Sequence, residues 1–304
     1  QDVFPDVAIE VGAIANPKVI AVAKWLERFL YLRSDAVTVL SSDLADNLAA
    51  KIEGHRPERI RVIPNFVDTE RIRPTDPDNS YRAENDLTGR TVVMYAGNVG
   101  LSQSLDLVVE AARRFRDRGR DDVVFVINGG GSALAGLRES ARGLDNLRFV
   151  GMQPRERLPE VLAAGDLHLV PLRTGLARSS VPSKLYSILA AGRPVLASVD
   201  GGTEVATTIE RAGAGVSVPP EDADRFVSAL DRMLSDRTAL AAMGASGRAF
   251  VEGWVSPAAV GAAYEQLFES VRVGRLRTGA CPRTGVLSSP WGGFGPRAVA
   301  ALPS

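Results

Sequence analysis

The sequence predicts an α/β protein built around a doubly wound parallel sheet, and two observations lead to this prediction. From about residue 90 onward, short apolar runs alternate with amphipathic segments at a spacing of about 20–30 residues, which is typical of βαβ units. The short runs are apolar without interruption, as expected of parallel strands that are buried on both faces.

Six strands are predicted in this region, at residues 91–96, 123–128, 147–150, 167–171, 194–198 and 215–218. After the first strand, apolar residues recur at the spacing of one helix face, at Leu105, Val108, Ala112 and Phe115. The N-cap of this helix is expected at Ser102 or Ser104. A second amphipathic helix is expected near residue 230, after an acidic first turn at residues 221–224.

The first third of the chain predicts only part of a second α/β domain. Helices are expected at residues 18–34 and 43–51, and strands at residues 36–40 and 60–63. Core packing is the expected use of Trp25, Phe29 and Leu30 in the first helix, with contact to a membrane as the alternative.

These elements divide the chain into five parts. We expect residues 1–72 to be the remnant of an N-terminal domain, and the polar, proline-containing residues 73–89 to be an interdomain linker. Residues 90–252 are expected to form the C-terminal domain, and residues 253–271 are expected to form a helix that, as the family resemblance described below implies, packs back toward the N-terminal domain. Residues 272–304 hold five Arg, six Gly, four Pro and no acidic residue, which predicts a disordered tail.

Composition excludes several function classes. The 304 residues carry 36 Lys+Arg and 36 Asp+Glu, so no chain-wide positive field is available for nucleic acid. Without the tail the chain holds 31 basic and 36 acidic residues, a net charge of −5. Cys281 is the single cysteine, and His55 and His168 lie far apart without ligand spacing, so neither a disulfide nor a zinc site is expected. No apolar run is long enough to cross a membrane and no signal peptide is visible, which favours a cytoplasmic location.

Two glycine-rich turns follow the first two strands of the C-terminal domain. The first reads Gly97-Asn98-Val99-Gly100 and the second Asn128-Gly129-Gly130-Gly131-Ser132. In open α/β sheets, ligands bind outside the carboxyl ends of the strands, where backbone N–H groups can approach an anion. A tight turn without a ligand is the alternative. The pattern is not a GxGxxG fingerprint, and no acidic residue ends the second strand, so an NAD enzyme is disfavoured.

A lysine at a predicted helix start is the most informative single residue. Pro182 and Ser183 are typical helix-start residues, which places Lys184 in the first turn. A cation there opposes the helix dipole, and an anionic ligand would explain it. A solvated lysine is the alternative. Asp-x-Asp pairs at residues 76–78 and 222–224 lie in a linker and at a helix start, so metal binding is not expected.

Five motifs in order resemble the family 4 glycosyltransferases, and most closely those of colanic-acid and O-antigen synthesis. They are residues 63–68 (IPNFVD), 95–100 (YAGNVG), 181–184 (VPSK) with 191–195 (AGRPV), 203–206 (TEVA) and 215–220. The similarity extends over residues 1–271. It implies a GT-B fold, in which two Rossmann-like domains face each other across a cleft. It also implies retaining, metal-independent transfer of a hexosyl or N-acetylhexosaminyl group from a UDP- or GDP-sugar, with no cofactor, to a saccharide or lipid-linked acceptor.

The resemblance also assigns roles to single residues. Gly97, Asn98 and Gly100 would line the diphosphate, and Ser183, Lys184 and Leu185 would meet phosphate or ribose. The nucleoside would lie against the two strand ends at Asn128, Gly129 and Gly130 and at Gly151 and Met152. Glu204 would lie near the sugar or ribose, although a helix-start glutamate is an equally good explanation of this residue.

Two departures from the family pattern qualify the expected activity. Related sequences commonly place a lysine after the first glycine turn, where this chain has Ser102-Gln103, and Arg178 is a candidate substitute for the missing charge. Residues 1–72 resemble the last third of the N-terminal domain, so the general base is expected outside this sequence. We therefore predict nucleotide binding with little or no transfer by the chain alone. A non-catalytic nucleotide-sugar-binding module and a GT-B nucleotide-sugar epimerase are the alternatives. Contact with the inner membrane face is a further expectation.

Overall fold

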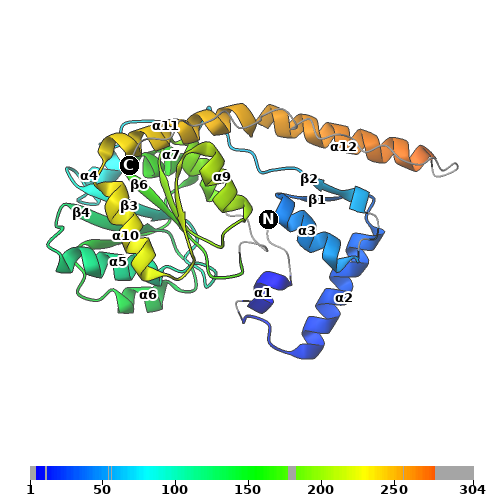
Figure 1. Ribbon diagram of the computed structural model, residues 1–304, viewed down its shortest axis with the longest axis horizontal. Coiled ribbons are helices and arrows are strands. Elements are labelled where there is room, and N and C mark those ends of the chain that lie inside the picture. The colour runs from blue at the N-terminus through cyan, green and yellow to red at the C-terminus, as the bar shows by residue number, and fades with distance from the viewer. Residues whose placement is uncertain are drawn as a thin grey trace, which may run out of the picture. The chain divides into compact units, whose positions relative to one another are not determined.

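The computed structural model describes residues 5–10, 12–53, 55, 57–176, 183–255 and 257–277 (Figure 1). Contacts divide the chain into two compact units, residues 1–265 and 266–304. The first unit holds a two-stranded and a six-stranded sheet, and both are parallel throughout. Of the second unit, the structure describes the end of one helix.

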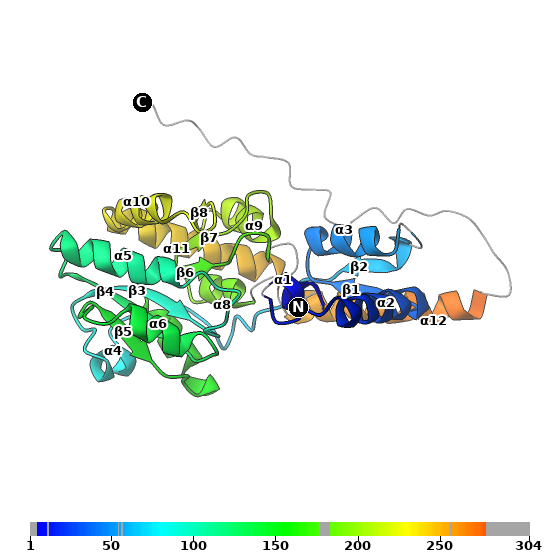
Figure 2. The same ribbon diagram turned by 90° about the horizontal axis from the view of Figure 1, so that it is seen from below.

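The six-stranded sheet confirms the predicted α/β fold. Its strands are β3 (Thr91–Ala96), β4 (Val123–Asn128), β5 (Leu147–Val150), β6 (Leu167–Pro171), β7 (Val195–Ser198) and β8 (Gly215–Val218). Their spatial order is β5-β4-β3-β6-β7-β8, as Figure 2 shows. The chain therefore builds outward in one direction from β3 to β5, returns to the middle, and builds outward in the other direction from β6. This is the doubly wound order of dinucleotide-binding folds.

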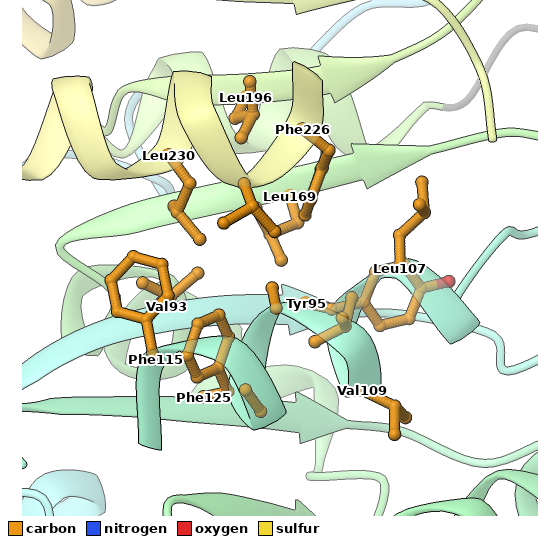
Figure 3. Packing of buried hydrophobic residues seen from close by; sticks show 14 of the residues in the cluster. Val93, Tyr95, Leu107, Val109, Phe115, Phe125, Leu169, Leu196, Phe226 and Leu230 are labelled. Atoms are coloured by element: carbon orange, nitrogen blue, oxygen red, sulfur yellow. The ribbon is translucent and has the colours of Figure 1, made fainter. Parts of the chain in front are cut away.

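Helices cover both faces of this sheet. They are α4 (Ser80–Glu84), α5 (Asp106–Asp117), α6 (Leu134–Ser140), α7 (Leu158–Ala164), α8 (Lys184–Ala190), α9 (Glu204–Ala212), α10 (Ala223–Leu234) and α11 (Arg237–Trp254), with a 3-10 turn at Arg155–Arg157. Successive side chains of β3 point to opposite faces. Val93 and Tyr95 pack under α5 and α10 (Figure 3). Val92 and Met94 pack against Tyr81 and residues of α7 on the other face.

Two buried groups in the sheet have specific partners. Phe115 of α5 packs edge-on against Phe125 of β4, with ring centroids 5.5 Å apart (Figure 3). His168 in β6 is fully buried, and its Nε2 lies 2.9 Å from the carbonyl oxygen of Leu162. Burial lowers the pKa of His168 to about 4, so the ring is neutral near pH 7. His168 is therefore a core residue.

The N-terminal part contains α1 (Asp6–Glu10), α2 (Pro17–Arg33), β1 (Val37–Val39), α3 (Ser42–Lys51), a 3-10 turn at Pro57–Arg59 and β2 (Ile60–Val62). Val39, Leu44 and Leu48 form a small core, against which Tyr31 of α2 packs. The expected core packing of Trp25, Phe29 and Leu30 is wrong, because these side chains are 64%, 45% and 54% exposed. In the described part of the chain, the small core contacts α2 through Tyr31, and Trp25, Phe29 and Leu30 are not part of it.

Two predicted boundaries differ from the structure. Within residues 73–89, helix α4 forms, and Tyr81 and Leu87 are fully buried against the sheet, so part of the predicted linker belongs to the domain core. The last helix, α12 (Pro257–Arg277), continues past residue 272, where the tail was expected to begin. Residues 278–304 of that tail lie outside the described residues.

None of the described helices is both long enough and apolar enough to span a membrane.

Candidate functional site

The strand order reverses between β3 and β6, and the crevice at such a point is where open α/β sheets bind ligands. Three segments of the described chain meet there, namely the glycine turn after β3, the glycine turn after β4, and the start of α8. The sequence predicted all three as site elements. The structure adds how they hold one another.

The two glycine turns are joined by backbone hydrogen bonds. The N–H of Gly97 donates to the carbonyl oxygen of Asn128 at 3.0 Å, and the N–H of Val99 donates to that of Gly130 at 2.9 Å. In return, the N–H of Ala133 donates to the carbonyl oxygen of Val99 at 3.0 Å. These bonds continue the pairing of β3 with β4 beyond the strand ends and make one rigid surface of the two turns.

Glycine is required in the second turn because the first one lies so close. A Cβ atom on Gly129 would lie 1.9 Å from the carbonyl oxygen of Gly97, and one on Gly131 would lie 2.3 Å from that of Val99. Their φ angles of 153° and 158° also disfavour other residues. Gly130 between them has open space. Packing between the turns therefore explains Gly129 and Gly131 without a ligand.

Several N–H groups expected to face an anion are already engaged. The Gly97 and Val99 N–H groups bond across to the second turn, and the Gly100 N–H donates to Oε1 of Gln103 at 3.0 Å. Gly100 is buried, whereas Asn98 is exposed. These three N–H groups therefore fix the turn, and ligand contacts from it would come chiefly from Asn98.

Lys184 is the first residue of α8, and its ammonium group lies over the ring of Tyr95. Its Nζ is 3.8 Å from the ring centroid, and a Cβ on Gly97 would lie 3.3 Å from the same atom. The residue keeps some exposed surface, but its ammonium group is desolvated between the ring and the turn, and this lowers the pKa of Lys184 to about 7. No carboxylate among the described residues forms an ion pair with it.

The sequence did not predict the role of Tyr95, because Tyr95 lies in a run of apolar residues that is typical of a buried strand. Its ring is fully buried, and burial raises its pKa above the ordinary value, so the hydroxyl keeps its proton. That hydroxyl donates to the carbonyl oxygen of Asn98. Tyr95 thus supports the turn from below and offers its ring face to Lys184, a favourable cation–π contact.

The other predicted residues differ in what they can offer. Leu185 is 1% exposed in the core, and Asn128 is buried with its Oδ1 accepting a hydrogen bond from Tyr81 Oη at 2.8 Å, so both side chains are engaged in the fold. Ser183 is exposed at the start of α8, without a side-chain capping bond, and Gly151 and Met152 are exposed after β5. Arg178 lies outside the described residues.

Glu204 begins α9, where its carboxylate accepts a hydrogen bond from Thr208 Oγ1 at 3.3 Å. Partial burial raises the pKa of this carboxyl above its usual range.

The predicted N-cap of α5 is wrong, because α5 begins at Asp106 after Leu105, and Ser104 Oγ is buried without a partner among the described residues. The Gly100 N–H donates to Gln103 Oε1, so the turn continues to Gln103 and the helix begins after it, at Asp106.

Two family profiles match the chain. "Glycosyl transferases group 1" matches residues 90–236, and "Glycosyltransferase Family 4" matches residues 14–71. The putative colanic acid biosynthesis glycosyl transferase WcaI of Escherichia coli K12 is 33% identical over 243 residues, which cover 77% of this chain and 58% of that protein. A GDP-mannose-dependent phosphatidylinositol monomannoside mannosyltransferase of Mycobacterium tuberculosis is 31% identical, covering 72% of this chain and 57% of its own length.

Solved structures share the fold. The sucrose-phosphate synthase of Thermosynechococcus elongatus superposes with a TM-score of 0.70 at 21% identity, covering 86% of this chain and 65% of that one. HepE of Anabaena in complex with UDP-glucose superposes with a TM-score of 0.69 at 15% identity, covering 83% and 68%. The chain thus spans a little over half the length of these curated relatives and about two thirds of these solved chains.

Proposed function

The chain belongs to the group 1/family 4 glycosyltransferases of GT-B fold, and from this premise we propose that it binds the diphosphate of a nucleotide sugar at the crevice between β3 and β6. The bound donor would present its sugar for transfer to a hydroxyl acceptor in bacterial surface polysaccharide synthesis. Lys184 is the cation that would meet the diphosphate.

One observation carries the proposal. Lys184 places an ammonium group without a carboxylate partner, among the described residues, beside the glycine turn at the switch point of the sheet. An enclosed cation without a counter-charge is costly, and an anionic ligand offsets that cost. A solved structure of HepE contains UDP-glucose, which supports a nucleotide sugar as the anion.

The chemistry of the transfer belongs to the same proposal. We infer a retaining, metal-independent reaction of a hexosyl or N-acetylhexosaminyl donor, in which Lys184 stabilises the negative charge that develops on the departing diphosphate. The acceptor is a saccharide or a lipid-linked saccharide, and the reaction takes place in the cytoplasm or at the inner membrane face. Because the chain spans 58% of WcaI, we expect donor binding from it and little or no turnover.

Calorimetric titration with UDP, GDP and ADP tests donor binding. We expect one of them to bind, and Lys184→Met to weaken that binding by about 1–3 kcal/mol, the usual worth of a charge-assisted contact. Lys24→Met is the matched control, because Lys24 is an exposed lysine of α2. Absence of binding at millimolar concentrations of all three nucleotides would refute the proposal.

A non-catalytic binding module is the second candidate, favoured by the engaged N–H groups of the glycine turn and by Ser102 after it. Adding an N-terminal region of the length found in the relatives separates the two candidates. Transfer of radiolabelled sugar by the longer protein supports the enzyme. Tight donor binding without transfer or epimerisation in the longer protein supports the module.

A further inference from the structure

One arginine joins loops from three different strands beside the candidate site. Arg173 follows β6, and its Nε donates to the carbonyl oxygen of Leu101 at 2.8 Å, just beyond the glycine turn. Its backbone N–H donates to the carbonyl oxygen of Ser102 at 3.1 Å. Its guanidinium also pairs with Asp106 at 3.6 Å and with Glu221, which follows β8, at 3.0 Å.

Glu221 receives a second set of bonds from the same segment. Its Oε2 accepts from the hydroxyl of Thr174 at 2.7 Å and from the Thr174 N–H at 3.2 Å. The hydroxyl of Thr174 holds the pKa of the Glu221 carboxyl below its usual range, so the carboxylate stays charged near pH 7. The backbone φ of Glu221 is 58°, which is unusual for a residue other than glycine.

The next residue adds the loop after β7. The N–H of Gly175 donates to Oδ2 of Asp200 at 2.8 Å. The segment from Arg173 to Gly175 therefore contacts loops that follow β3, β7 and β8, and it lies on the chain that leads from β6 to Lys184. We refer to the paired Arg173 and Glu221 as the clasp.

We propose that the clasp positions the glycine turn relative to Lys184 and so sets the affinity for the donor diphosphate, an inference that rests on the proposed function. The Gly97–Gly100 turn is fixed to β4 on one side by its own backbone bonds. On the other side, Leu101 and Ser102 are held by Arg173. Arg173 and Glu221 are positioning residues, because their charges are satisfied by each other, by Asp106 and by backbone groups.

The test compares nucleotide binding by the full 304-residue chain and its variants Arg173→Ala, Glu221→Gln and the double variant. UDP is the probe, or GDP if the unaltered chain prefers it. We expect each single variant to bind about three- to thirtyfold more weakly, the range for residues that act through a network. The double variant should bind no more weakly than either single one, because both remove the same clasp.

Arg116→Ala is the matched control. Arg116 is 37% exposed at its side chain against 41% for Arg173, and it likewise pairs with a carboxylate, Asp117, and donates to a carbonyl oxygen, that of Gly143. It lies at the last turn of α5, away from the strand ends that carry the site. Arg116→Ala should leave nucleotide affinity unchanged.

Hydrogen exchange adds a readout that global destabilisation does not mimic. Amides at residues 100–103 should lose protection in Arg173→Ala, while amides of β3 and β4 keep theirs. Unchanged affinity in Arg173→Ala, or additive losses in the double variant, would overturn the clasp. Absence of nucleotide binding by the unaltered chain would instead overturn the proposed function, and the inference with it.

Discussion

The desolvated ammonium of Lys184 predicts that donor binding weakens as the pH rises above 7. Enclosure between Tyr95 and the glycine turn lowers its pKa to about 7, whereas a bound diphosphate would favour the charged form and raise the pKa again. In the proposed complex, the anion would therefore bind the protonated lysine. Above pH 7, a proton must be taken up from solution before or during binding.

The size of the effect follows from the two protonation states. At pH 6 the lysine is mostly charged, and at pH 8 about one molecule in ten carries the charge when the pKa is about 7. The dissociation constant should therefore be about tenfold higher at pH 8 than at pH 6, which corresponds to about 1.4 kcal/mol. Near pH 7.5 binding should be accompanied by the uptake of most of one proton.

Calorimetry with UDP-glucose measures both quantities. A nucleotide sugar is the right probe because each of its phosphates carries one ester and one anhydride bond and has no ionisation near neutral pH, whereas the terminal phosphate of UDP titrates near pH 6. Repeating the titration in buffers of different ionisation enthalpy gives the protons taken up. Lys184→Arg is the control, since arginine stays charged throughout. A flat profile for the unaltered chain, or an equal slope in Lys184→Arg, would refute this reasoning.

Three further predictions concern stability. Gly129→Ala should lower the free energy of unfolding in urea by about 2–4 kcal/mol, because the new Cβ would overlap the carbonyl oxygen of Gly97. Gly130→Ala is the control: its Cβ would have open space, and its free energy of unfolding should change by less than about 0.5 kcal/mol. The pKa of buried His168 is about 4 against about 6.5 unfolded, so unfolding should become easier by about 3 kcal/mol as the pH falls from 7 to 4. The free energy of unfolding should depend less on pH in His168→Gln. An equal pH dependence in both proteins would contradict the lowered pKa of His168. Arg248→Lys should cost about 1–3 kcal/mol in thermal unfolding, because the guanidinium donates at 2.7 Å to the carbonyl oxygens of both Ile72 and Ala190, and an unchanged Tm would argue against these bonds.

The six-stranded sheet was predictable because each of its strands is a short apolar run with turn-forming or polar residues on either side. The predicted limits of the strands at residues 91–96 and 123–128 coincide with those of β3 and β4. The buried part of residues 73–89 was not predictable by this logic. Tyr81 and Leu87 stand alone among polar residues, and only the sheet surface that they reach makes them core residues.

The candidate site was predictable in part, for a related reason. Glycine turns and a helix-start lysine are local patterns, and the sequence indicated all three segments. The roles within them depend on contacts between segments. Arg173 and Glu221, which pair in the clasp, are separated by 48 residues in the sequence. Even the local bond from the Gly100 N–H to Gln103 Oε1 follows from the shape of the turn and not from a residue pattern. Tyr95 is part of a recognisable motif, yet its contact with Lys184 appears only once β3 and α8 are placed together.

The charge of the chain gives Lys184 a particular importance. Residues 1–271 carry a net charge of −5, so the overall field does not attract a diphosphate. In the described part of the site, the N–H groups of Gly97, Val99 and Gly100 are engaged, which leaves little backbone polarity to replace that field. A single ammonium can still act strongly if water is excluded from around it, because electrostatic interactions strengthen as the local dielectric falls. Tyr95 and Gly97 enclose part of the ammonium group, and the lowered pKa of Lys184 follows from the same burial. The proposed affinity for the anion and the predicted sensitivity to pH would therefore both follow from one packing arrangement.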